Sequence, residues 1–194
     1  MRWMKGSLPL RLAALLLAVT TGCAHTPPPA PSAPPGSVYT AAQQQALAGT
    51  WVYTADPVET AALELGIERS VSGLFSLAQG VAAESLRART TPRPELTLEF
   101  QGSTVRITSP GELPESGTLD GPAVLLTNRF GDQTQTTFRI EDGNLITRGI
   151  SDGGSGETVF APGADGQMLR LTRRVASDQL SAPLEVTFSY RRQH

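Results

Sequence analysis

Residues 95–192 contain a series of short segments in which apolar and polar side chains alternate. In chain order these segments are ELTLEF, TVRIT, AVLLTNRF, TQTTFRI, LITRGI, ETVFA, MLRLTRR and LEVTFSY. Turn-forming pairs lie between them: Gly131–Asp132, Asp142–Gly143, Gly153–Gly154 and Asp165–Gly166. A period of two places successive side chains on opposite faces of a strand, and Gly beside Asp favours tight hairpins. This stretch therefore predicts an antiparallel β-meander.

A further strand is predicted at Leu47–Thr54, and helices at about 57–89 separate it from the meander. Asp56 can cap a helix from Pro57 to about Leu65, which Gly66 could end. A second helical pattern with one apolar stripe runs from Ile67 to about Arg89. Two glycines either weaken this second helix or divide it into two pieces: Gly73 and Gly80.

These elements together define the expected fold class. A meander of about 8–10 strands usually closes on itself, because closure removes the exposed strand edges. We therefore predict a mainly β fold, an antiparallel meander barrel with a helical insert after the first strand, over residues 39–194.

The N-terminus has the pattern of a secretory signal. The basic residues Arg2, Lys5 and Arg11 precede an uncharged apolar run, Leu12–Val19, and small residues follow it. The run is shorter than the roughly 20 residues that a transmembrane helix needs. The junction Gly22–Cys23 resembles that of bacterial lipoproteins, in which the cysteine thiol is acylated after cleavage. This resemblance implies a signal peptide over residues 1–22 and a lipid anchor on Cys23.

The residues after the cysteine predict a spacer. Six prolines between Thr26 and Ser37 favour an extended polyproline II conformation, so residues 23–38 are interpreted as the lipidated cysteine and its linker. Ala24, in the second position after cleavage, implies the outer membrane under the sorting rule of Gram-negative lipoproteins. We expect a protein anchored by its N-terminal lipid on the periplasmic face of that membrane.

The predicted domain lacks the residues that most catalytic and metal sites use. His25, His194, Lys5 and Cys23 all lie outside residues 39–193, which therefore contain no His, Lys or Cys. This excludes cysteine nucleophiles, Schiff-base lysines, histidine bases and His/Cys zinc sites there. We expect no enzyme activity, no metal and no cofactor. No basic stripe is present, so no nucleic-acid partner is expected either.

The order of elements resembles that of the calycin barrels. Lipocalins share the pair Gly49 and Trp51 in the first strand, which is expected to help close one end of the barrel. The helix pair directly after that strand, and the segment VTFSYRR near the end, are similar to the fatty-acid-binding proteins. In the calycin pattern the tryptophan packs against a late-strand arginine, for which Arg191 and Arg173 are candidates.

One departure from the fatty-acid-binding proteins concerns the ligand. Those proteins hold a carboxylate with an Arg-x-Tyr pair on the last strand; Tyr190 matches the tyrosine, but Phe188 stands at the arginine position. Aromatic side chains are the candidate ligand contacts: Phe75, Phe100, Phe138, Phe188 and Tyr190. Two functions are favoured over a third, an enzyme that uses only carboxylate, serine and tyrosine side chains. The domain either binds or carries a lipid or other apolar molecule, or it is a structural or assembly lipoprotein that binds another envelope protein.

Overall fold

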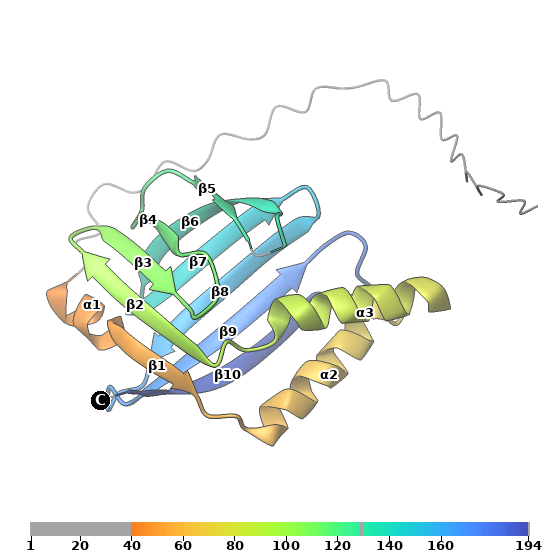
Figure 1. Ribbon diagram of the computed structural model, residues 1–194, viewed down its shortest axis with the longest axis horizontal. Coiled ribbons are helices and arrows are strands. Elements are labelled where there is room, and N and C mark those ends of the chain that lie inside the picture. The colour runs from red at the N-terminus through yellow and green to blue at the C-terminus, as the bar shows by residue number, and fades with distance from the viewer. Residues whose placement is uncertain (1–39, 129, 194) are drawn as a thin grey trace, which may run out of the picture. The chain divides into compact units, whose positions relative to one another are not determined.

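Ten antiparallel strands form one sheet in the computed structural model, which describes residues 40–128 and 130–193 (Figure 1). The helices are α1 (Ala41–Leu47), α2 (Pro57–Val71) and α3 (Ser76–Thr90). The strands are β1 (Gly49–Tyr53), β2 (Glu95–Gln101), β3 (Thr104–Thr108), β4 (Glu115–Thr118), β5 (Val124–Thr127), β6 (Gln133–Glu141), β7 (Asn144–Ser151), β8 (Gly154–Pro162), β9 (Met168–Ala176) and β10 (Leu184–Arg192). The predicted signal peptide (1–22), the lipidation site Cys23 and the linker (23–38) lie outside the described residues.

The strand order confirms the predicted meander barrel. It runs β4-β3-β2-β1-β10-β9-β8-β7-β6-β5, so the first strand pairs with the last one as well as with β2. The barrel is nearly, but not fully, closed. Strands β4 and β5 remain as the two edges of the sheet. One parallel bridge, Leu119 to Phe138, connects the end of β4 with β6. At Gly117 a Cβ atom would lie 2.4 Å from the Phe138 ring, so this close approach requires glycine.

The two helices after β1 differ in their bounds from the prediction. Helix α2 continues through Gly66, where a Cβ atom would lie only 2.7 Å from Leu184 Cδ1 on β10. Glycine at this position therefore permits close packing of α2 on the sheet and does not end the helix. The break falls at residues 72–75, which include Gly73, and α3 begins at Ser76. None of the described helices is both long enough and apolar enough to cross a membrane.

The core combines inward side chains of the strands with buried residues from all three helices. One row of paired, buried positions crosses five neighbouring strands: Ile140, Leu145, Phe160, Leu171 and Phe188. Helix α1 contacts β7 and β8, and helix α2 packs on β10 with its buried residues Leu63, Ile67 and Val71. The burial of these apolar side chains is the main contribution to the stability of the barrel.

Trp51 lies in this core, and it stacks on an arginine as expected from the calycin pattern. The arginine is Arg192, however, and neither Arg191 nor Arg173 as predicted. Arg192 pairs directly with Trp51 across β1 and β10, and its guanidinium carbon lies 4.2 Å from the ring centroid. Arg191 was the wrong candidate because its side chain points to the outer face of β10, whereas that of Arg192 points inward. At Gly49, with φ of 129°, a Cβ atom would lie 2.7 Å from Arg192 Nη1, so this close approach requires glycine.

Candidate functional site

A large cavity lies between helix α3 and the inner faces of strands β5 to β9. Its volume is about 1380 Å³. Helix α3 and the residues just before it contribute apolar side chains, and several of these are among the most exposed apolar groups of the described chain: Phe75 (72%), Leu77 (79%) and Val81 (69%). Exposed apolar side chains grouped along a cavity are a common feature of binding sites for apolar molecules.

The sheet side of the cavity differs in character from the helix side. Most of its lining residues on β6, β7 and β8 are small, and many carry hydroxyl groups: Thr134, Thr136, Thr147, Gly149, Ser151, Gly154, Gly156 and Thr158. Gly156 has room for a side chain, since a Cβ atom there would make only an ordinary van der Waals contact, with Arg174 O at 3.8 Å. The cavity therefore has an apolar helical side and a polar, hydroxyl-bearing sheet side.

The most buried part of the polar side is one row of paired positions. It lies next to the row of buried apolar residues that includes Leu145, Phe160 and Leu171. Thr147 pairs with Thr158, and Thr158 pairs with Arg173, so these three side chains lie next to one another on β7, β8 and β9. Both threonines are more than nine-tenths buried. Neither hydroxyl hydrogen-bonds another described residue. Arg173 donates to the carbonyl oxygen of Arg89 at the end of α3, over 2.7 Å.

A second arginine on the cavity wall is bound by two carboxylates. Arg93 forms ion pairs with Glu112 and Glu115, both at 2.6 Å. Burial, and then the positive charge of Arg93, lower the pKa of Arg173, while Glu115 and Glu112 counteract this. Two cations and two carboxylates therefore balance one another at this part of the cavity.

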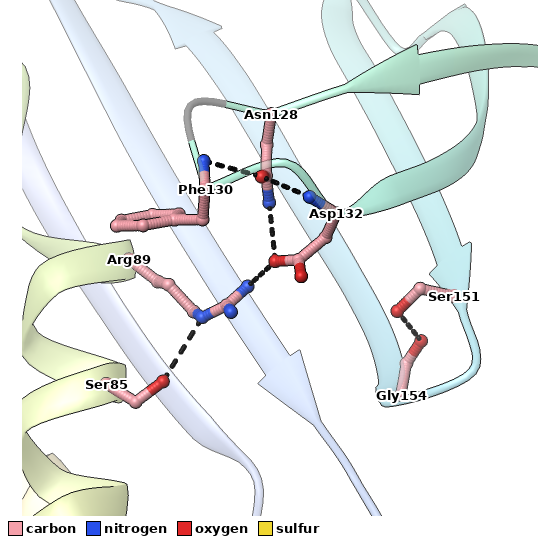
Figure 2. A network of polar contacts seen from close by, with 7 residues as sticks. All are labelled: Ser85, Arg89, Asn128, Phe130, Asp132, Ser151 and Gly154. Atoms are coloured by element: carbon pink, nitrogen blue, oxygen red, sulfur yellow. Dashed lines mark hydrogen bonds and ion pairs between the residues drawn. The ribbon is translucent and has the colours of Figure 1, made fainter.

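Helix α3 is attached to the β5–β6 turn by a polar network (Figure 2). Arg89 Nη1 lies 2.6 Å from Asp132 Oδ2, its Nε donates to Ser85, and its guanidinium carbon lies 5.0 Å from the centre of the Phe130 ring. Asn128 organises the turn, because its amide donates to Asp132 while its side-chain oxygen accepts from two backbone N–H groups. The hydrogen bond from Asn128 and the charge of Arg89 hold the pKa of Asp132 below its usual value.

The predicted aromatic contacts lie in different parts of the barrel. Phe75 lines the large cavity, next to α3. Phe138, Phe188 and Tyr190 are at least 99% buried, and Phe100 is partly buried against the same core. Phe188 and Tyr190 border a small void of about 20 Å³, which they share with Thr147, Thr158 and Arg173. These two rings therefore lie next to the row of Thr147, Thr158 and Arg173. Contact of the predicted aromatic rings with a ligand stays a prediction.

Tyr190 has a structural partner for its hydroxyl group. The hydroxyl donates to the carbonyl oxygen of Arg93 over 3.0 Å. Burial raises the pKa of Tyr190 to about 12, so the group is a neutral phenol at any ordinary pH. Phe188, and not an arginine, stands at the inward position before this tyrosine on the last strand.

Sequence reasoning missed the polar row, although a signal for it is present. The inward positions of β7 and β8 change from apolar (Leu145, Phe160) to threonine (Thr147, Thr158) and then to glycine (Gly149, Gly156). Aligned across a hairpin, this change marks where a packed core gives way to a cavity.

The comparisons with known proteins identify the fold. No protein-family model matches the sequence, and no curated protein matches it at a significant level. Among solved structures, apo lipid binding protein 8 of Caenorhabditis elegans is similar, with 12% identity, a TM-score of 0.52, and coverage of 81% of this chain and 100% of that chain. An abundant heat soluble (SAHS) protein of Ramazzottius varieornatus has 11% identity, a TM-score of 0.51, and coverage of 76% and 96%. At this identity the likeness concerns the fold alone: this chain shares the antiparallel β-barrel fold of these two structures.

Proposed function

We propose that this protein binds or carries an apolar or amphipathic small molecule in its barrel and is not an enzyme. The observation that carries the proposal is the cavity of about 1380 Å³ beside the exposed apolar side chains of α3. Its volume exceeds the range of about 300–1,000 Å³ usual for small-molecule sites, which suits a long or bulky ligand. The fold shared with a protein named for lipid binding supports the same conclusion.

Native mass spectrometry of the protein purified from its own host tests this function. A bound molecule should appear as a constant mass difference that is lost when the protein is unfolded. We expect a ligand with an apolar portion, because the helix side of the cavity offers only aliphatic and aromatic contacts from residues 74 to 82. Protein free of any bound molecule, which also fails to bind the apolar probe diphenylhexatriene, would contradict the proposal.

We further propose that a lipid on Cys23 anchors this domain to the outer membrane, on its periplasmic face. The support is the sequence alone: the junction Gly22–Cys23 follows a basic and then an apolar segment. Several acyl chains, at about 0.8 kcal/mol per buried methylene, give stable attachment. Cells that express Cys23→Ser should incorporate no labelled fatty acid into this protein, and the variant should leave the membrane fraction. Undiminished labelling of the variant would contradict the anchor.

A further inference from the structure

The row Thr147, Thr158 and Arg173 has hydrogen-bonding capacity that the protein itself does not use. The two hydroxyl groups have no partner among the described residues, although both side chains are more than nine-tenths buried. Arg173 makes one described hydrogen bond, to the carbonyl of Arg89, and its other N–H groups have no described partner. Neither hydroxyl oxygen is fully buried, so both groups face the cavity with unused hydrogen-bonding capacity and are open to contact by a ligand.

The charges around this row determine which ligand group it can accept. Arg93 is already in contact with Glu112 and Glu115, and both carboxylates also act on Arg173. An added carboxylate or phosphate would therefore enter a region whose charges already cancel, close to two existing carboxylates. The free-energy cost of removing that anion from water would not be offset by an unpaired positive charge. An uncharged oxygen, such as that of an ester, amide or hydroxyl group, can accept from Arg173 and the hydroxyls without this cost.

We propose that this row is a subsite for the uncharged, oxygen-bearing group of an amphipathic ligand, whose apolar part lies along α3. The subsite rests on the proposed function and names the class of ligand that this function serves. The polar end of the ligand is innermost, against β7, β8 and β9, and the apolar end lies toward Phe75, Leu77 and Val81. The polar sheet side and apolar helix side of the cavity match the two ends of such a molecule.

The test compares three probes of different head-group chemistry on the full chain. Diphenylhexatriene, which has no polar atom, reports on the apolar cavity by its fluorescence. Monooctanoylglycerol and octanoate are then titrated as competitors, because they share one acyl chain and differ in charge. We expect monooctanoylglycerol to displace the probe at a concentration about tenfold lower than octanoate, a difference in the range of a few hydrogen bonds.

The double variant Thr147→Val, Thr158→Val locates the effect. Valine has nearly the shape of threonine, and neither hydroxyl bonds the protein, so we expect the fold to persist. The variant should bind monooctanoylglycerol about tenfold more weakly and diphenylhexatriene unchanged, since only the oxygen contacts are lost. Thr137→Val makes the same chemical change on the outer face of β6 and should alter neither affinity.

The outcomes separate this subsite from the proposed function. Absence of diphenylhexatriene binding contradicts the function itself. If the probe binds, and the double variant affects monooctanoylglycerol no more than Thr137→Val does, the subsite is wrong while the function stands. Stronger binding of octanoate than of monooctanoylglycerol overturns the assignment of an uncharged group.

Discussion

Arg192 stabilises one end of the barrel through a cation–π contact and three hydrogen bonds. Its guanidinium stacks on Trp51 and donates to the carbonyl oxygens of Ala46, Ala48 and Gly166. It thereby connects the end of α1, the start of β1 and the turn before β9 to the last strand. Trp51 is fully buried, and its indole N–H donates to the carbonyl of Leu47 over 2.9 Å.

Replacing Arg192 by glutamine should therefore destabilise the fold. The change removes a cation–π contact and leaves backbone carbonyls without their donor, at a cost of about 2–4 kcal/mol in the free energy of unfolding. Urea denaturation measures this cost. The matched control is Arg191→Gln on the outer face of the same strand, where we expect a change within about 0.5 kcal/mol. Equal effects of the two substitutions would show that the contacts of Arg192 contribute nothing specific.

At the scale of elements, the apolar stripe predicted on one helix serves two different purposes. Its first part lies on α2, where Ile67 and Val71 are buried. Its later part lies on α3, where Val81 is 69% exposed and lines the cavity. Helical periodicity reports which side chains share a face. It does not report whether that face meets a packed sheet or a cavity, because this depends on how the helix is placed in the fold.

A charge on each part of the stripe should distinguish these two environments. Val71→Asp places an unpaired carboxylate in the core and should lower the free energy of unfolding by about 2–4 kcal/mol. Val81→Asp, the same substitution on α3, should change it by less than about 0.5 kcal/mol. We expect this second variant to weaken diphenylhexatriene binding instead. Similar unfolding midpoints for the two variants would contradict this division of the stripe.

The attachment of α3 to the β5–β6 turn should depend on pH. Because the folded-state pKa of Asp132 is lowered, its contribution to stability is fully present above the ordinary value of 3.8 and is lost as the pH falls through the lower folded-state value. The difference in urea midpoint between the wild type and Asp132→Asn should thus be constant at higher pH and shrink in this acidic range. Asp142→Asn controls for the loss of one negative charge at another hairpin turn. A difference that is independent of pH would contradict the role of the Arg89–Asp132 pair.

At the scale of the whole molecule, the sequence predicted the parts of the fold that depend on local pattern. The hairpins followed from period-two segments with Gly–Asp turns, the first helix followed from Asp56 and Pro57, and the second followed from its apolar stripe. Strand β4 (ESGT) was missed because it has no alternating apolar residues. The rings of Phe138, Phe188 and Tyr190 are buried in the barrel, but sequence alone does not give their height in it. That height depends on the register of many strands, which brings threonines of β7 and β8, and not the rings of Phe138 or Phe188, to the large cavity.

The cavity itself can be partly filled from one position without disturbing the core. At Gly156 an added Cβ meets nothing closer than 3.8 Å, and the residue lies on the inner face of β8, two positions from Thr158. Gly156→Leu should therefore fold normally while its side chain occupies the cavity. We expect diphenylhexatriene binding to weaken by about tenfold, the change that about 1.4 kcal/mol of lost contact produces. Ala161→Leu puts the same side chain on the outer face of that strand, outside the residues that line the cavity, and should leave binding unchanged. If both variants bind the probe like the wild type, the ligand site lies somewhere other than between α3 and strands β5 to β9.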